Sequence, residues 1–316
     1  MIIDLRQTTT SRISKELITV REQAGVYALT RVLTLIISCR AEDLEDAIAA
    51  ANSASNEHPM RIIAVVDAQD NTGDHLDGQI RVGSDAGASE VIVLHAYGQS
   101  SEDPESLVTG LLLPDAPVVV WWPGQAPDDV ANSALGRLAQ RRITDAYRAA
   151  DPRAALAQRR RSYAPGDTDL AWTRLTGWRT QIATALARVW AGNVEAIRIT
   201  GAMHTPSIEL LATWLHDVVA CPVKLRQAHP DSEVGIEEVC VTTAQGDFTI
   251  AREGGSDVVR VQRPGTPIQR VLVPRRSLSD CLAEELRTLA PDQTFGAVLA
   301  AWSSDTRDAQ YLEEAD

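Results

Sequence analysis

The sequence predicts an α/β protein built from two α/β domains. Its 316 residues suit about two domains of roughly 150 residues each. Short β-branched runs alternate with amphipathic segments in the first half, and short strands separated by turn residues dominate the second half. We therefore expect an N-terminal domain with a mainly parallel sheet and helices on both faces. The C-terminal domain should combine a βαβ unit with antiparallel hairpins in a mixed sheet.

Hydrophobic spacing places the elements of the first half. Ile13, Leu17 and Val20 recur at helical spacing and predict a helix that ends at Gly25. Apolar β-branched runs are typical of buried strands, and a proline is favoured in the first turn of a helix. In chain order we expect a strand at 32–37, a helix at 42–51, a strand at 61–66, a turn at 71–74, a strand at 90–94, a helix at 104–113 and a strand at 117–122.

A change of composition marks the domain junction. Residues 151–168 are rich in arginine and separate domain 1–150 from domain 169–304 as a linker or a solvated helix face, or as a basic docking patch. A long helix over 169–191 follows, because Leu175, Trp178 and Ile182 form an apolar stripe. Beyond it we expect strand 195–200, helix 207–219, strands 222–226, 237–242, 248–251, 258–262 and 269–273, helices 278–289 and 295–302, and an acidic tail over 305–316.

The charge balance narrows the possible partners. The net charge of −13 repels phosphate backbones and anionic lipids, so we expect neither nucleic acid nor membrane as a partner. No apolar run approaches the roughly 18 residues that span a bilayer. The N-terminus lacks the basic and apolar regions of a secretory signal, which predicts a cytoplasmic protein.

Motifs for catalysis, metals and cofactors are missing from the sequence. It contains no GxGxxG after a strand, no phosphate loop, no HExxH and no GxSxG, and its six histidines have no ligand spacing. The sequence therefore predicts no cofactor and no metal. The four cysteines, Cys39, Cys221, Cys240 and Cys281, form no CxxC pair and fit either buried thiols or a redox switch.

One loop has the composition of a phosphate site. Residues 200–207 follow a predicted strand and open a helix, where ligands bind in open α/β sheets and where free backbone N–H groups favour anions. The candidate phosphate-binding residues are Gly201, His204, Thr205 and Ser207. The alternative is an ordinary helix start, with Thr205 or Ser207 as the N-cap and Pro206 in the first turn.

Tryptophan and arginine gather at two places in the chain. Consecutive residues of a strand point to opposite faces, so Trp121 and Trp122 cannot lie in one layer. Trp and Arg are enriched at interface hot spots, although tryptophan is also usually buried in a core. The candidate partner-binding residues are Trp121, Trp122, Trp172, Arg174, Trp178 and Arg179.

Several segments resemble one family. Residues 169–179 (DLAWTRLTGWR) and 117–123 (PVVVWWP), together with 31–35 and 58–63, are similar to segments of the glucose-6-phosphate dehydrogenase assembly protein family, OpcA. The likeness covers most of the chain, and the composition rich in Arg and Ala fits the actinobacterial branch. None of these segments encodes a reaction.

The resemblance implies a non-catalytic protein of the oxidative pentose phosphate pathway. Such a protein would bind glucose-6-phosphate dehydrogenase, favour its active oligomer as an allosteric activator and so control NADPH supply. We expect alanine at Trp172 and Arg174 to weaken complex formation while leaving the fold intact. The alternative is a sugar-phosphate sensor or an enzyme that uses the 200–207 loop, and a sugar-phosphate effector is compatible with either function.

Overall fold

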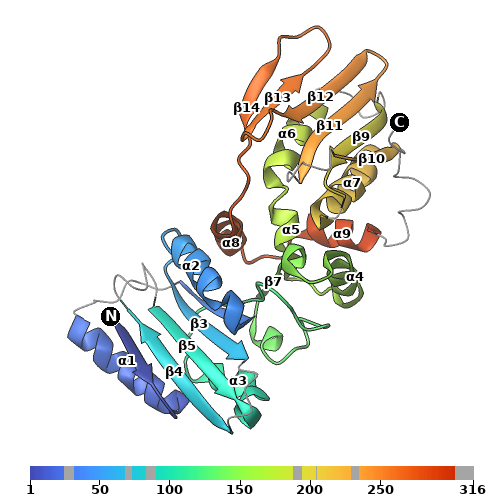
Figure 1. The fold of residues 1–316 in the computed structure, drawn as a ribbon. Coiled ribbons are helices and arrows are strands. Elements are labelled where there is room, and N and C mark those ends of the chain that lie inside the picture. The colour runs from blue at the N-terminus through green and yellow to red at the C-terminus, as the bar shows by residue number, and fades with distance from the viewer. Residues whose placement is uncertain are drawn as a thin grey trace. The chain divides into compact units, whose positions relative to one another are not determined.

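The computed structural model describes residues 1–24, 32–67, 73–82, 90–187, 194–203, 205–228 and 235–302. The chain packs as two compact units, each assembled from separate stretches (Figure 1). Unit 1 comprises Met1–Ala150, Ser162–Leu170 and Ser277–Asp292, and unit 2 comprises Asp151–Arg161, Ala171–Arg276 and Gln293–Asp316. The chain therefore passes from one unit to the other at the predicted junction and again on both sides of 277–292.

A mostly parallel sheet forms the centre of unit 1. Among the described residues it has eight strands in the order β1-β4-β5-β3-β2-β6-β7-β8. Strands β1 and β4 pair antiparallel at one edge, and the remaining six strands run parallel. The bounds are β1 Ile2–Leu5, β2 Leu33–Arg40, β3 Met60–Asp67, β4 His75–Arg81, β5 Glu90–Tyr97, β6 Val118–Trp121, β7 Arg141–Thr144 and β8 Asp167–Asp169.

Helices cover both faces of this sheet, as predicted. One core joins Leu35 and Trp121 to α2 and α8, and the other joins Ile36 and Trp122 to α1 and α3. Trp121 and Trp122 therefore do point to opposite faces. The helices of unit 1 are α1 Thr10–Ala24, α2 Leu44–Ala54, α3 Pro104–Thr109 and α8 Leu278–Arg287.

Buried ion pairs fix strands and helices of unit 1 to one another. Arg61 of β3 and Glu90 of β5 are 2.8 Å apart, with side chains 8% and 1% exposed. Arg141 of β7 pairs with Glu285 of α8 and also donates to the Ala290 carbonyl. If the two elements separated, each buried side chain would be left as an unpaired charge away from water, which is costly. These contacts therefore specify which elements pack together.

Unit 2 has a mixed sheet, as predicted. Its six described strands lie in the order β10-β9-β11-β12-β13-β14. Strands β9 and β10 are parallel and are joined by α7, which makes one βαβ unit, and the other neighbours are antiparallel. The bounds are β9 Val194–Gly201, β10 Val223–Gln227, β11 Ile236–Thr243, β12 Gly246–Arg252, β13 Val258–Gln262, β14 Gln269–Leu272, α4 Pro152–Ser162, α5 Leu170–Thr173, α6 Thr176–Leu186, α7 Pro206–Val219 and α9 Gln293–Ala301.

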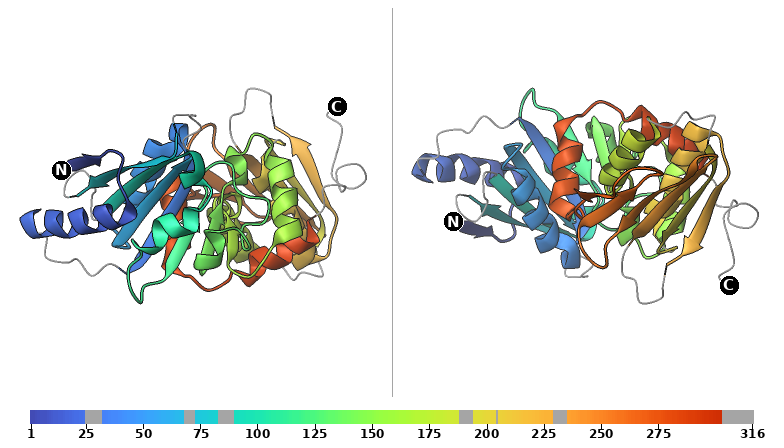
Figure 2. Two further views of the ribbon diagram at one scale, coloured as in Figure 1. Left: turned by 90° about the horizontal axis from the view of Figure 1, so that it is seen from below. Right: turned by 90° about the horizontal axis from the view of Figure 1, so that it is seen from above.

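The sheet of unit 2 buries one face. Ile197 and Ile199 of β9 are buried on the side of the helices, whereas Arg226 of β10 and Arg260 of β13 are exposed on the opposite side. This alternation is typical of an antiparallel sheet with one solvated face. Figures 1 and 2 show the helices of this unit on one side of its strands.

The structure differs from the sequence prediction at several elements. Strands β1, β4, β7 and β8 were not predicted, and the arginine-rich segment 151–168 is mainly helix α4. The predicted helix over 169–191 is wrong: Asp169 ends β8, and α5 and α6 are separate helices. The predicted stop at Gly25, the last residues of the 169–191 helix and part of the 71–74 turn lie outside the described residues.

The Arg61–Glu90 pair yields a stability prediction. Replacing Glu90 by Gln leaves a buried guanidinium without its counter-charge, so the free energy of unfolding should fall by about 3–5 kcal/mol. Urea denaturation would measure this loss. The matched control is Glu105→Gln, which removes the exposed pair of Glu105 with Arg137 and should cost less than about 1 kcal/mol. Equal losses in the two variants would contradict the role assigned to the buried pair.

Candidate functional site

The parallel strands of unit 1 create a position where many α/β folds bind a ligand. The order β5-β3-β2-β6-β7-β8 numbers the strands 3-2-1-4-5-6 along the chain, which is the order of dinucleotide-binding folds. In that topology the crevice lies at the carboxyl ends of the first and fourth strands, here β2 and β6. A glycine-rich turn after the first strand normally holds the pyrophosphate there.

In this chain acidic residues stand at that position. β2 is followed by the 3-10 turn Ala41–Asp43 and then by α2, whose first turn carries Glu45 and Asp46. Asp43 accepts a hydrogen bond of 3.1 Å from Arg148. A Cβ at Gly124, just after β6, would lie 2.9 Å from the Asp43 carboxylate, so this side chain closes the gap between the two loops. The turn therefore does not fit a pyrophosphate, because it lacks the glycines and the Asp43 carboxylate occupies the gap between the loops.

Trp121 and Trp122 lie inside unit 1. Their exposed fractions are 0% and 3%, and each belongs to one of the two cores. Their indole rings fill the space between β6 and the helices on either face. A partner protein cannot touch these rings without disrupting the core.

Trp172 and Trp178 are equally buried, inside unit 2. Trp172 of α5 is 1% exposed, with the Arg179 guanidinium 3.7 Å from its ring centroid and Phe295 6.1 Å away. Trp178 of α6 is 5% exposed and lies under Arg252. Alanine at Trp172 would therefore remove core packing and would not leave the fold intact. Of the six predicted contact residues, Arg174 and Arg179 are the two with intermediate exposure.

The hydroxyl groups of the 200–207 loop are already engaged. Thr205 donates to the Ala202 carbonyl at 2.8 Å, and Ser207 donates to the Ala171 carbonyl at 2.9 Å. Gly201 ends β9, where a Cβ would lie 2.2 Å from the Gly235 carbonyl oxygen, so it allows close packing of strands. Pro206 stands in the first turn of α7, and His204 lies outside the described residues. The structure thus brings Gly201, Thr205 and Ser207 together at the start of the helix without leaving the two hydroxyls free to donate.

The loop nevertheless borders a cavity of about 560 Å³. Its opposite wall is α4, which supplies Arg153 and Arg161. Arg153 lies 3.3 Å from Glu209, whose other oxygen accepts a hydrogen bond from Trp302. The cavity is therefore of mixed charge. Sequence spacing did not reveal it, because α4 and the loop are distant in the chain.

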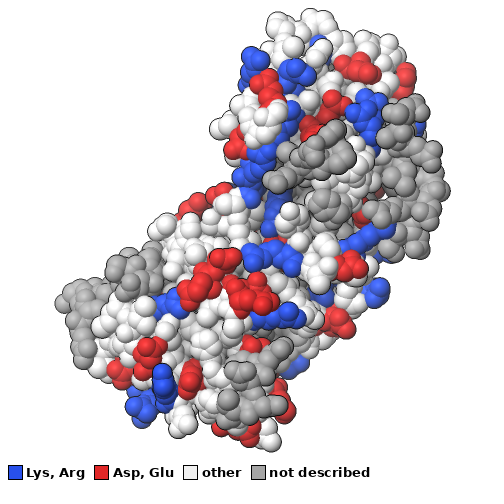
Figure 3. Space-filling model, in the orientation of Figure 1, with Lys and Arg blue, Asp and Glu red and all other residues white. Residues whose placement is uncertain are grey.

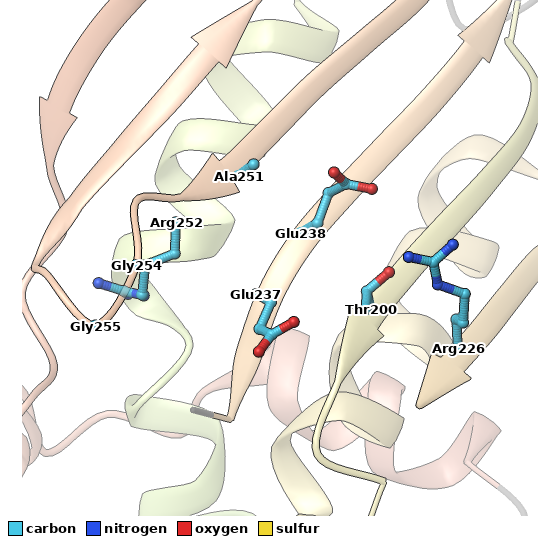
Figure 4. Close-up of a pocket in the computed structure, with 8 residues that line it drawn as sticks. All are labelled: Thr200, Arg226, Glu237, Glu238, Ala251, Arg252, Gly254 and Gly255. Atoms are coloured by element: carbon cyan, nitrogen blue, oxygen red, sulfur yellow. The ribbon is translucent and has the colours of Figure 1, made fainter. Parts of the chain in front are cut away.

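A second, smaller cavity of about 310 Å³ opens on the solvated face of the sheet in unit 2. Figure 4 shows Thr200, Arg226 and Glu238 side by side on β9, β10 and β11. Thr200 is 4% exposed, and its hydroxyl is buried without a hydrogen-bond partner. Thr200 therefore lines this cavity with its hydroxyl oxygen buried.

The cysteines are buried thiols. All four are reduced and buried. Burial raises the pKa of the Cys39 thiol to about 12, with a further contribution from the Asp43 carboxylate. Burial also raises the pKa of Cys221 and Cys240. Since the thiolate is the reactive form, these groups are poor redox sensors in the folded chain.

The described residues lack both a metal cluster and a membrane span. No three His, Cys, Asp or Glu side chains among them are grouped so that they could hold a metal ion. Within the same residues, each helix is too short or too polar to cross a bilayer.

Comparison with protein families gave two adjacent matches. Residues 51–161 match the model for the N-terminal domain of a glucose-6-phosphate dehydrogenase subunit. Residues 165–299 match the model for the C-terminal domain of the same subunit. A comparison with curated proteins found no significant match.

Solved structures with a similar chain path are distant in sequence. They include KijD10, a 3-ketoreductase from Actinomadura kijaniata in complex with NADP, at 10% identity over 85% of this chain and 94% of that one, with a TM-score of 0.47. A putative oxidoreductase from Klebsiella pneumoniae is 12% identical over 89% of this chain and 97% of that one, with a TM-score of 0.43.

The acidic turn after β2 predicts that nicotinamide dinucleotides do not bind. A dinucleotide with a Kd near 10 μM would add about 2.7 kcal/mol to the free energy of unfolding when present at about 1 mM. We expect NAD⁺ and NADP⁺ to leave the melting temperature unchanged at that concentration, with an NADP-dependent dehydrogenase as the positive control. A clear rise in the melting temperature would show that the turn does accept a dinucleotide.

The raised pKa values predict inert thiols. Burial keeps the Cys39 thiol protonated near neutral pH, because it raises the pKa of that thiol to about 12. The folded protein should therefore react slowly with a colorimetric disulfide reagent, and the chain unfolded in guanidinium should show its four thiols at once. Rapid reaction of one thiol in the folded protein would instead support a redox switch.

Proposed function

This chain belongs to the family of glucose-6-phosphate dehydrogenase assembly proteins (OpcA), and we propose that it is a non-catalytic factor that binds glucose-6-phosphate dehydrogenase and favours its active oligomer. The observation that carries this proposal is the pair of family matches, which together span most of the chain. In this role the protein raises NADPH supply through the oxidative pentose phosphate pathway.

The chemistry of unit 1 supports a role without hydride transfer. The position that would hold a dinucleotide pyrophosphate carries Asp43, paired with Arg148, and no glycine-rich turn. A protein that shares the strand order of dinucleotide-binding folds but not their anion site fits a binding partner better than a second dehydrogenase.

The proposed mechanism is a shift of population. The protein stabilises the active assembly of the dehydrogenase by the difference between its affinities for the active and inactive forms. We call residues 172–179 the Trp/Arg segment. Within it, Arg174 and Arg179 are the proposed contacts with the dehydrogenase. Trp172 supports one of them indirectly, because the Arg179 guanidinium lies against its ring.

A second function has one observation in its favour. The 200–207 loop borders the 560 Å³ cavity, where Arg153 and Arg161 could attract a sugar phosphate. Asp151 and Glu209 line the same cavity and oppose an anion. A rise in the melting temperature with glucose 6-phosphate alone, lost in Arg161→Ala, would favour this sensor function.

Activity of the dehydrogenase tests the main proposal. We expect the two proteins to co-elute in size-exclusion chromatography, with a higher kcat or a lower KM for glucose 6-phosphate than the dehydrogenase alone. Arg174→Ala should raise the Kd of the complex about tenfold, because arginines at interfaces often act as hot spots. The control is Arg12→Ala on α1, an exposed arginine that should leave binding as in the wild type.

Two results would count against the proposal. Absence of both co-elution and kinetic change, in reducing and oxidising buffer, would exclude the assembly function. Normal binding by Arg174→Ala would exclude Arg174 as a contact but would leave the assembly function itself supported.

A further inference from the structure

We infer that the outward face of the β13–β14 hairpin is a docking surface for an acidic region of a partner protein. This docking patch consists of Val258, Arg260, Ile268, Arg270 and Leu272. The inference rests on the proposed function for the identity of the partner, since glucose-6-phosphate dehydrogenase serves as the probe.

Strand register places the docking patch on the solvated face of the sheet. β14 is the last strand of the sheet, and its antiparallel pairing with β13 sets Arg260 opposite Arg270 and Val258 opposite Leu272. Side chains two residues apart in a strand share a face. Val259 and Val261, which alternate with these residues, are buried on the other side.

The patch exposes apolar side chains next to its arginines. Leu272 is 69% exposed, the largest value for any large hydrophobic side chain among the described residues, and Ile268 is 52% exposed. Val258 lies beside Leu272 across the strand pair. Adjacent exposed apolar side chains rimmed by charge are a common mark of a protein–protein contact.

The charge of the hairpin opposes that of the whole chain. Residues 258–276 contain five arginines and no acidic residue, in a protein with a net charge of −13. Glu253 pairs with Arg270 at 2.8 Å and Asp257 pairs with Arg275 at 3.4 Å. Figure 3 shows basic side chains along the border of this unit where Figure 1 draws β13 and β14, with a few acidic ones beside them.

Among the described residues, Arg260 is the arginine of the docking patch without an internal counter-charge. It is exposed, and within the same residues it has no ion-pair partner. It lies directly opposite Arg270, and like charges at opposed positions of two strands are unfavourable. A carboxylate from outside the chain would relieve this repulsion and accept a bidentate hydrogen bond from the guanidinium.

The face of the hairpin, and not its edge, is the part suited to docking. β14 has four residues and is flanked by Pro267 and Pro274. Short length, proline and charge protect an edge strand from pairing with another strand. An acidic partner surface could instead bind the exposed face of the hairpin, where it would cover Leu272 and pair with Arg260.

The experiment compares two pairs of variants in binding to the dehydrogenase. Arg260→Glu and Leu272→Asp alter the docking patch, and Arg12→Glu and Val218→Asp alter an exposed arginine of α1 and an exposed apolar residue of α7. We expect at least a tenfold rise in Kd for the first pair and less than a twofold change for the second. The milder Arg260→Gln should fall between them, and circular dichroism checks that each variant folds.

Ionic strength gives a second readout. If Arg260 meets carboxylates, binding of the wild type should weaken as salt rises, and Arg260→Gln should show a smaller salt dependence. A merely structural role of Arg260 would not change that slope.

The outcomes separate the two proposals. Wild-type affinity in both patch variants would overturn the docking surface and leave the assembly function intact. Absence of binding by the wild type would overturn both. Binding of the wild type to duplex DNA that is lost in the patch variants, with unchanged binding to the dehydrogenase, would assign the patch to nucleic acid and overturn the inference.

Discussion

The contact between Arg141 and Glu285 is the constraint on which unit 1 depends. It joins β7 to α8, although 144 residues separate the two partners in the chain. α8 brings Cys281, Leu282 and Leu286 into the core that covers one face of the sheet. Residues 171–276 belong to unit 2, so the core of unit 1 is completed only by α8, which follows them in the chain. The two family matches divide the chain near residue 163, but packing does not follow that division, so neither matched segment alone contains a whole unit.

Hydrophobic pattern predicted the strands whose burial comes from apolar residues, and it failed where burial comes from polar pairs. β2 and β3 are continuous apolar runs, and the sequence located both. β7 and β8 contain Arg142 and Asp167, which are buried because each neutralises the other at 2.5 Å. From the sequence alone, an arginine and an aspartate are expected to be solvated, because their pairing in the fold is not visible there. The predicted long helix failed for a related reason, since the buried Asp169 accepts hydrogen bonds from Thr144 and the Ala146 amide within the sheet of unit 1.

Composition located the Trp/Arg segment but could not distinguish an interface from a core. Tryptophan and arginine stack on one another equally well between proteins and within one. In this chain Arg179 over Trp172 and Arg252 over Trp178 are internal contacts, so the residues that suggested an interface largely pack against themselves. In the hairpin, composition shows an excess of arginine, but the docking patch depends on register: Arg260 and Arg270 are ten residues apart in sequence and become neighbours only through strand pairing. The cavity between α4 and the 200–207 loop was missed for the same reason.

An assembly factor must bind one state of its partner more tightly than the other. A broad surface can provide that difference in affinity as well as a pocket can. The electrostatics of the chain are consistent with that requirement. In unit 1 the position suited to an anionic cofactor carries Asp43, which pairs with Arg148 and fills the gap beside Gly124, so the turn lacks the glycines and the space that this strand order provides elsewhere. In unit 2 positive charge is concentrated on an open sheet face beside exposed apolar side chains, where it can select an acidic protein surface.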